Sequence, residues 1–226
     1  VDKLVKDDKM KKDDAIFNVL RDYIKKSKKI RFEGDGYADA WQVEAEKRGL
    51  SNNKTTPGAL KAQISKKTIA LFEEMGVMNK REIEARYEIQ VEDYSMRIQI
   101  EGRILGDIAR NHVIPTAIRY QNILIKNVRG LKEIFMDDFE KHSKEQIQII
   151  KEISEHIEHI NADITKMIDA RKKANLIEDA EKRAFSYCDD VKPYFEEIRY
   201  HCDKLELLVD DEIWPLTKYR ELLFTK

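Results

Sequence analysis

The sequence predicts an all-α protein in which long antiparallel helices form a bundle, preceded by a shorter helical part. Three observations predict this fold. Only 8 Gly and 4 Pro occur in 226 residues, which is few for a loop-rich or all-β protein. Charged residues make up 38% and apolar residues 42%, a mixture typical of amphipathic helices with charged outer faces. Apolar residues also recur at helical spacing, and no stretch shows the alternation of a strand.

The first part of the chain is predicted to hold several short helices. Residues 1 to about 30 form one or two charged helices, with Ile16, Leu20 and Ile24 along one side. Asp35 or Asp39 is expected to cap a following helix that buries Trp41. Breaks between the helices are marked by Gly34, Gly36, Gly49, the pair Thr56 and Pro57, and Gly76.

The second part of the chain is predicted to form long helices with narrow apolar seams. Steps of three and four residues place such seams on one face of each helix, which must then pack against another helix. A first seam begins with Tyr87, Val91, Tyr94 and Ile98 and belongs to a long helix interrupted only at Pro115. The other two seams are Ile150, Ile153, Ile157, Ile160, Ile164 and Met167, and then Val191, Phe195, Ile198, Cys202, Leu205 and Val209.

The stretch LGDIARNHVIPTAIRYQN, residues 105–122, gathers polar side chains around Pro115. A proline inside a helix removes one N–H donor and crowds the carbonyl four residues earlier, here that of Asn111. A bent helix lined by its own polar groups therefore explains the stretch. No nucleophile is placed against a base, so we favour a hinge or a polar seam over a catalytic cluster. The polar residues are Asp107, Arg110, Asn111, His112, Arg119, Gln121 and Asn122.

The histidines and cysteines do not predict a metal site or a nucleophile. His156 and His159 lie one turn apart beside glutamates, yet no histidine has Glu three residues before it, the spacing that carboxylate-bridged metal bundles use. In the frame of the isoleucine seam, His156 flanks the seam and His159 faces outward. Cys188 and Cys202 lack zinc spacing, and Cys202 is expected to be a buried thiol. We predict no catalytic, cofactor-binding or metal-binding residue in this chain.

Charge and hydropathy do not indicate a nucleic-acid or membrane partner. Lys and Arg (42) nearly balance Asp and Glu (43), and no apolar run reaches the roughly 20 residues of a membrane helix. GDGY lacks the remainder of a phosphate loop, and the basic run RDYIKKSKKIR is interpreted as a solvated helix face. Two cysteines and no signal peptide predict a cytoplasmic protein. Because Val1 opens inside a charged helical pattern, we expect a longer parent chain.

Several long phrases resemble the C-terminal region of type III glutamine synthetase, the large bacterial form of that enzyme. They occur in order and at fitting spacing over nearly the whole chain, and the resemblance weakens over about 140 to 190. Neither an Asn-Arg-Phe-Glu type motif nor a Gly-rich nucleotide loop is present, so no catalytic residue is carried over. The phrases are GDGYADAWQVEAEKRGLSNNKTT, LFEEMGVMNKREIEARYEIQVEDY, QIEGRILGDIARNHVIPTAIRYQNILIKNVRGLKEIF and WPLTKYRELLF.

This resemblance implies a parent enzyme that joins ammonia to glutamate with ATP and Mg²⁺ or Mn²⁺, none of them bound by this segment. Residues 1–95 would be closing helices of the catalytic-domain scaffold, and residues 96–226 a C-terminal helical extension. Expected partners are the catalytic domain and other subunits of a ring-shaped homo-oligomer. The segment alone is expected to be inactive and to support assembly or stability. The alternative is a stand-alone helical interaction module that pairs through the seam from Ile150 to Met167.

Overall fold

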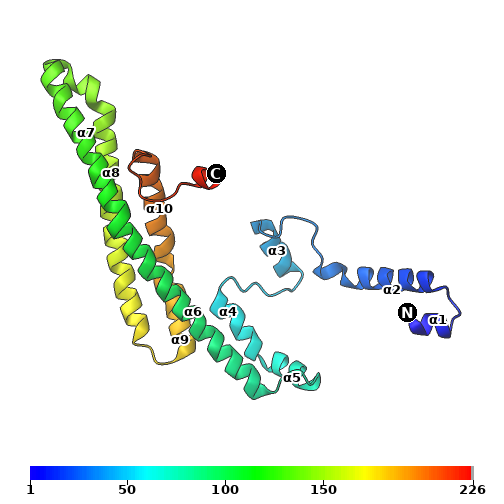
Figure 1. The fold of residues 1–226 in the computed structure, drawn as a ribbon. Coiled ribbons are helices and arrows are strands. Elements are labelled where there is room, and N and C mark those ends of the chain that lie inside the picture. Colours follow the sequence, from blue (N-terminus) through cyan, green and yellow to red (C-terminus); the bar gives the residue numbers. More distant parts are fainter. Residues whose placement is uncertain (225–226) are drawn as a thin grey trace. The chain divides into compact units, whose positions relative to one another are not determined.

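The structure is a computed structural model that describes residues 1–224. It is all-α in this range, as predicted, and the chain divides into two compact units, Val1–Lys54 and Thr55–Lys226 (Figure 1). The predicted boundary after residue 95, between closing helices of the catalytic-domain scaffold and a C-terminal extension, stays a prediction about the parent protein. The helix that contains residue 95 runs through it without a break.

The first unit consists of short helices with little buried apolar surface. It contains α1 (Asp2–Lys6), α2 (Lys12–Lys26) and α3 (Asp39–Lys47). Phe32 and Trp41 pack ring against ring with centroids 4.4 Å apart. The predicted cap of α3 by Asp35 or Asp39 is wrong: α3 begins after Ala38 with no side-chain cap. The Asp35 carboxylate instead accepts a hydrogen bond from the Tyr37 backbone N–H at 2.9 Å, because a turn aspartate bonds its own backbone two residues on.

The second unit opens with α4 (Thr56–Lys61), α5 (Lys66–Glu74) and the long α6 (Lys80–Ile108). Pro57 lies in the first turn of α4, where its missing N–H costs nothing. A reciprocal capping box begins α6. The Asn79 side chain accepts from the Glu82 N–H at 3.0 Å, and the Glu82 carboxylate accepts from the Asn79 N–H at 2.8 Å. Two otherwise unpaired backbone donors are thereby satisfied, which fixes where α6 starts.

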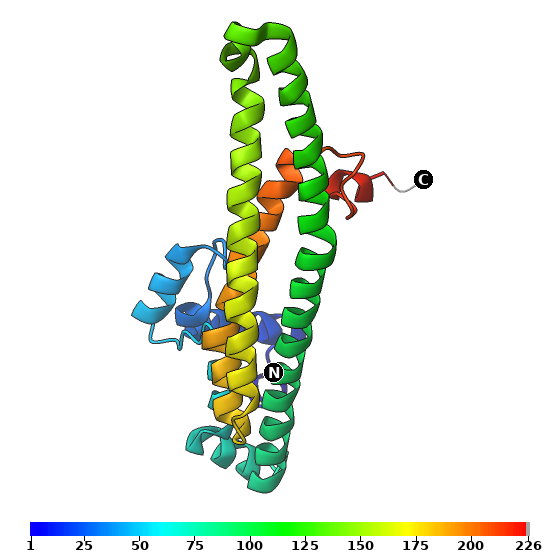
Figure 2. The ribbon, with the colours of Figure 1, turned by 90° about the vertical axis from the view of Figure 1, so that its left-hand side faces the viewer.

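The bundle is built on one long hairpin. α6 passes through a π-helical turn (Ala109–Val113) into α7 (Ile114–Phe135), and the chain then reverses into α8 (Phe139–Asn175). Figures 1 and 2 show α7 and α8 side by side in opposite directions. The chain returns through α9 (Ala180–Ser186), a second π-helical turn (Tyr187–Val191) and α10 (Pro193–Leu208), which packs along α8. A short α11 (Tyr219–Leu222) follows.

The predicted seams form the core of the second unit. Ile153, Ile160, Ile164 and Met167 of α8 are fully buried, and Ile150 and Ile157 pack against them. The α10 seam is confirmed in the same way by buried Val191, Ile198, Leu205 and Val209, with Phe195 and Cys202 half-buried beside them. The seam of α6 supplies Tyr87, Val91, Tyr94 and Ile98 to the same cluster. The periodicity of the sequence therefore locates the buried face of all three long helices.

Two glycines let α6 approach its neighbours closely. Gly102 and Gly106 lie one turn apart and both are buried. A Cβ added at Gly102 would lie 3.1 Å from the Phe195 ring, and one at Gly106 would lie 3.4 Å from the Met167 methyl group. The absence of side chains at these two positions sets the spacing between α6 and the side chains of α8 and α10.

Candidate functional site

The polar stretch around Pro115 lies on a π-helical turn. Within it, the Ile114 N–H bonds to the carbonyl of Ala109, five residues back. The additional residue in this turn provides space for the proline, whose ring would crowd the carbonyl of Asn111 in a regular α-helix. The same arrangement recurs before Pro193, where the Lys192 N–H bonds to the Tyr187 carbonyl at 3.0 Å. The predicted interruption at Pro115 is thus a change of hydrogen-bond register within one continuous helix.

A groove lies between this turn and α8. Its volume is about 270 Å³, and it is open to solvent. Arg103 and Arg110 come from α6 and the π-helical turn, and Arg171 comes from α8. The Arg110 guanidinium donates to the Thr165 hydroxyl at 3.1 Å, which ties it to α8. Gly102, Gly106, Asp107, Asn111, Ile164 and Ile168 complete the lining.

The polar residues of the stretch divide into four groups. Asp107, Arg110 and Asn111 line the groove, and the Asn111 amide donates to the Asp107 carboxylate at 2.5 Å. Gln121 instead joins α7 to α8, because its amide donates to the Ile150 carbonyl at 2.9 Å and to the Ser154 hydroxyl at 2.7 Å. Arg119 donates to Thr116 on its own helix at 2.8 Å. His112 and Asn122 are exposed. The stretch is therefore a polar seam on one side and a groove wall on the other.

Three histidines meet where α8 and α10 pack. The Nδ1 atoms of His156 and His201 are 2.9 Å apart, and the His159 ring stacks parallel on His201 with centroids 4.6 Å apart. Desolvation is the main cause that lowers the pKa of both His156 and His201. The sequence placed His156 beside the seam, as observed. It placed His159 facing outward; His159 is exposed, yet its ring stacks on His201 of α10. It gave no reason to expect His201 against them, although His201 directly precedes the seam residue Cys202.

Neither cysteine is a fully exposed thiol. Cys188 is buried. Cys202 lies in the α10 seam, as predicted, but is half-buried rather than fully buried. Burial raises the pKa of the Cys202 thiol to about 12. A thiol with such a pKa carries almost no thiolate at neutral pH and is a poor nucleophile.

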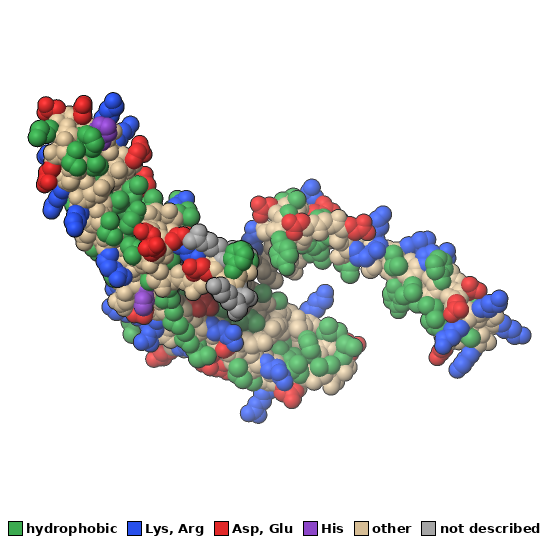
Figure 3. Space-filling view, turned by 45° about the horizontal axis from the view of Figure 1, so that its top comes forward, with side chains coloured by type: hydrophobic (Ala, Val, Ile, Leu, Met, Phe, Trp, Pro, Cys, Tyr) green, Lys and Arg blue, Asp and Glu red, His purple; other side chains and the backbone are tan. Residues whose placement is uncertain are grey.

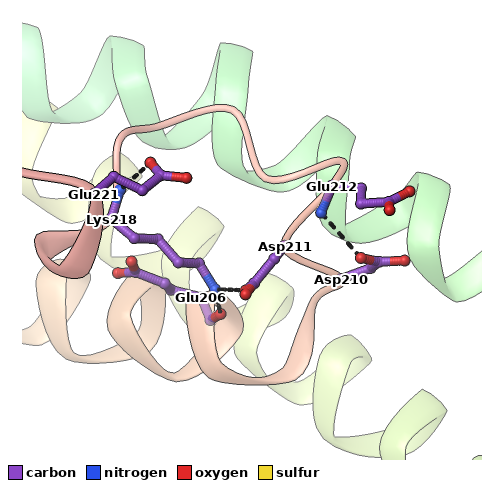
Figure 4. Close-up of polar contacts among 6 residues, drawn as sticks. All are labelled: Glu206, Asp210, Asp211, Glu212, Lys218 and Glu221. Carbon is purple, nitrogen blue, oxygen red and sulfur yellow. Dashed lines mark hydrogen bonds and ion pairs between the residues drawn. The ribbon is translucent and has the colours of Figure 1, made fainter. Parts of the chain in front are cut away.

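Lys218 links the C-terminal segment to the end of α10. The Lys218 ammonium donates to the Glu206 carbonyl at 2.8 Å and also pairs with Asp211 (Figure 4). The Lys218 backbone N–H donates to the Glu221 carboxylate at 3.0 Å. Trp214 packs against the core, so the segment returns onto the bundle.

The remaining candidates do not assemble into a reaction centre. GDGY forms the turn described above, and the basic run lies on α2 and the residues after it. Within residues 1–224, no three His, Cys, Asp or Glu side chains are positioned to hold one metal ion. None of the helices that the structure describes is both long enough and apolar enough to cross a membrane. The sequence pointed to Arg110 but not to its grouping with Arg103 and Arg171, because Arg171 lies far from the other two in the sequence.

Fold and sites together define an all-helical bundle protein whose polar clusters lie where helices meet. A comparison with known protein families identifies the family of the chain. The sequence profile of the family described as "Glutamine synthetase C-terminal domain" matches residues 15–132, and the chain belongs to this family.

Similar proteins agree with this assignment. A glutamine synthetase of Bacteroides fragilis is 45% identical over the whole chain, and a type-3 glutamine synthetase of Dictyostelium discoideum is 31% identical over 94% of it. A glutamine synthetase of Butyrivibrio fibrisolvens is 29% identical over 94% of the chain. The chain covers only 31%, 29% and 30% of these proteins, respectively. The resemblance to a C-terminal region of this enzyme is thereby confirmed.

Proposed function

We propose that this chain is the helical C-terminal part of an ATP-dependent glutamate–ammonia ligase and serves the assembly or stability of that enzyme. The catalytic residues, with ATP and Mg²⁺ or Mn²⁺, would belong to the part of the enzyme outside this chain. The observation that carries the proposal is the 45% identity to a glutamine synthetase along the entire chain, at 31% of that protein's length. The expected location is the cytoplasm, with other subunits of a homo-oligomer as partners.

An exposed apolar face on α2 supports a structural role. Phe17, Leu20 and Ile24 step by three and four along this helix and are 63%, 54% and 51% exposed. Figure 3 shows apolar side chains at the surface of this part of the chain. A helix with such a face gains stability mainly by packing it against other protein. We assign this face to the catalytic part of the same enzyme, because the matched relatives are about three times as long as this chain.

The proposal is tested by γ-glutamyl hydroxamate formation. Three proteins are compared: the whole enzyme, the whole enzyme without residues 55–226, and this chain alone. The cut at Lys54 respects the boundary between the two compact units. We expect activity and a large oligomer only for the whole enzyme, and smaller, inactive particles after truncation. Product formation by this chain alone would contradict the non-catalytic role.

Full activity and unchanged oligomer size after truncation would contradict the role in assembly. A matched variant tests the α2 face separately. Leu20→Asp places a charge in that face and should reduce oligomer size or activity of the whole enzyme. Asn53→Asp changes charge by the same amount in an exposed loop and serves as its control.

A further inference from the structure

The groove between α6 and α8 gathers positive charge without pairing it. Three guanidinium groups, those of Arg103, Arg110 and Arg171, line a space of about 270 Å³. Among the residues that the structure describes, none of the three forms an ion pair with a carboxylate, whereas Arg97 of the same helix α6 pairs with Asp93 at 2.7 Å. Like charges that share a groove repel one another, so an anion placed between them is strongly favoured.

The one carboxylate of the groove, that of Asp107, already has a hydrogen-bond partner. An oxygen of Asp107 accepts a hydrogen bond from the Asn111 amide at 2.5 Å. This bond holds one oxygen of Asp107 toward Asn111. The lining therefore has three cationic groups against one carboxylate that already has a partner.

The remaining walls favour binding of a small ligand. Gly102 and Gly106 bring the backbone of α6 into the lining, and Ile164 and Ile168 form an apolar wall on α8. Electrostatic attraction is stronger beside such a wall than in bulk water, because the local dielectric is lower. The bond from Arg110 to Thr165 holds one guanidinium in place before any ligand arrives, which lowers the entropy cost of binding.

We propose that this groove is a binding site for a small phosphate-bearing anion, with Arg103, Arg110 and Arg171 as its ligands. The guanidinium fork matches the oxygens of phosphate and can donate two parallel hydrogen bonds to it. A tetrahedral phosphate presents oxygens in three dimensions and can accept hydrogen bonds from two helices at once, whereas a carboxylate presents its two oxygens in a single plane. The volume suits a group of pyrophosphate size, either as a free anion or as the phosphate arm of a nucleotide.

Binding would also act on the structure of the bundle. Arg103 and Arg110 belong to α6 and the π-helical turn, whereas Arg171 belongs to α8. An anion held by all three would link two helices and stabilise the folded state in proportion to its occupancy. The site is independent of the catalytic chemistry proposed for the parent enzyme.

The test is a titration of the purified 226-residue chain with inorganic pyrophosphate by calorimetry, at constant ionic strength. We expect saturable one-to-one binding that raises the midpoint of thermal unfolding. Arg103→Gln and Arg171→Gln should each weaken binding about tenfold, the typical loss for one charge-assisted contact. Arg129→Gln is the matched control, because it removes the same charge from an exposed position on α7 outside the groove.

Two further ligands distinguish the sources and the chemistry. ADP that binds with the same dependence on Arg103 and Arg171 indicates the phosphate arm of a nucleotide, and pyrophosphate binding without ADP binding indicates a free anion. Citrate is the carboxylate control, and tighter binding of citrate than of pyrophosphate would overturn the assignment. So would the absence of binding at millimolar pyrophosphate, or an equal loss in Arg129→Gln. Circular dichroism of each variant separates lost binding from lost folding.

Discussion

The Nδ1 atoms of His156 and His201 lie 2.9 Å apart across the contact between α8 and α10. One ring nitrogen donates a proton here and the other accepts it. If both rings are charged, two N–H groups face each other and the contact cannot persist. The protonation of this pair is therefore coupled to the packing of the two helices.

This coupling predicts that the bundle loses stability in mild acid. Burial lowers the pKa of both histidines below the ordinary 6.5, so the unfolded chain binds protons more readily than the folded one. Their contribution is fully present above pH 6.5 and is lost as the pH falls through the lowered values. The groups that act on the pair are His159, Glu152, Glu155, Lys204, Asp163 and Glu197.

Urea unfolding at a series of pH values measures this effect. His201→Gln should flatten the dependence of the free energy of unfolding on pH between about 7 and about 5. His112→Gln is the control, since His112 is exposed and lies outside the cluster. A slope that is unchanged in His201→Gln would refute the coupling.

Substitution by alanine should affect stability differently at Gly102 and at Gly130. Both lie in helices, so both gain from the better helix propensity of alanine. Only at Gly102 does the new Cβ meet a neighbour, the Phe195 ring at 3.1 Å, whereas nothing lies within 4 Å at Gly130. We expect Gly102→Ala to be less stable than Gly130→Ala by about 1–3 kcal/mol, the usual cost of overpacking. Thermal unfolding of the two variants measures the difference, and equal midpoints would mean that the helices separate at no cost.

Tyr87 and Lys61 both contact Glu181, but their removal should have different effects. The hydroxyl of buried Tyr87 donates to Glu181 at 2.6 Å, while exposed Lys61 pairs with the other oxygen at 2.5 Å. Tyr87→Phe should cost about 1 kcal/mol, as for a typical hydrogen bond, and Lys61→Met less than about 0.5 kcal/mol, as for an exposed ion pair. Chemical unfolding of both variants tests this order. A larger loss in the free energy of unfolding for Lys61→Met than for Tyr87→Phe would contradict the prediction.

The contacts of Glu181 should also make the stability of the folded chain depend on pH in the acid range. Hydrogen bonds from Lys61 and Tyr87 lower the pKa of this carboxyl below its usual 4.5. The stabilisation that they give is present above pH 4.5 and is lost as the pH falls through the lowered value. Glu181→Gln should remove this part of the acid dependence, which titration of unfolding below pH 5 measures. If Glu181→Gln shows the same pH dependence of unfolding as the unmodified chain, this prediction is wrong.

The two thiols should be unreactive in the folded chain. Cys188 is buried, and burial raises the pKa of Cys202 to about 12. Iodoacetamide at about pH 8 should therefore label neither residue in native buffer and both in denaturant, because only thiolates react quickly. Mass spectrometry counts the labels. Rapid labelling of the native chain would show that the α10 seam opens readily.

The sequence by itself determined the helical fold class and the buried face of each long helix. Steps of three and four residues in the isoleucine seam of α8 and in the seam of α10 are local properties, readable because a helix has a fixed period. The family resemblance was likewise carried by phrases of consecutive residues. These features need no knowledge of how one helix lies against another.

Only the tertiary structure decided which polar groups meet. His201 lies 45 positions from His156, and Tyr87 lies 94 positions from Glu181. Arg171 joins Arg103 and Arg110 in the groove through the pairing of α8 with α6. Such contacts depend on the axial register and rotation of one helix against its neighbour. The packing of the whole core sets both quantities, with Gly102 and Gly106 fixing the closest approach, so the spacing within a single helix cannot predict them.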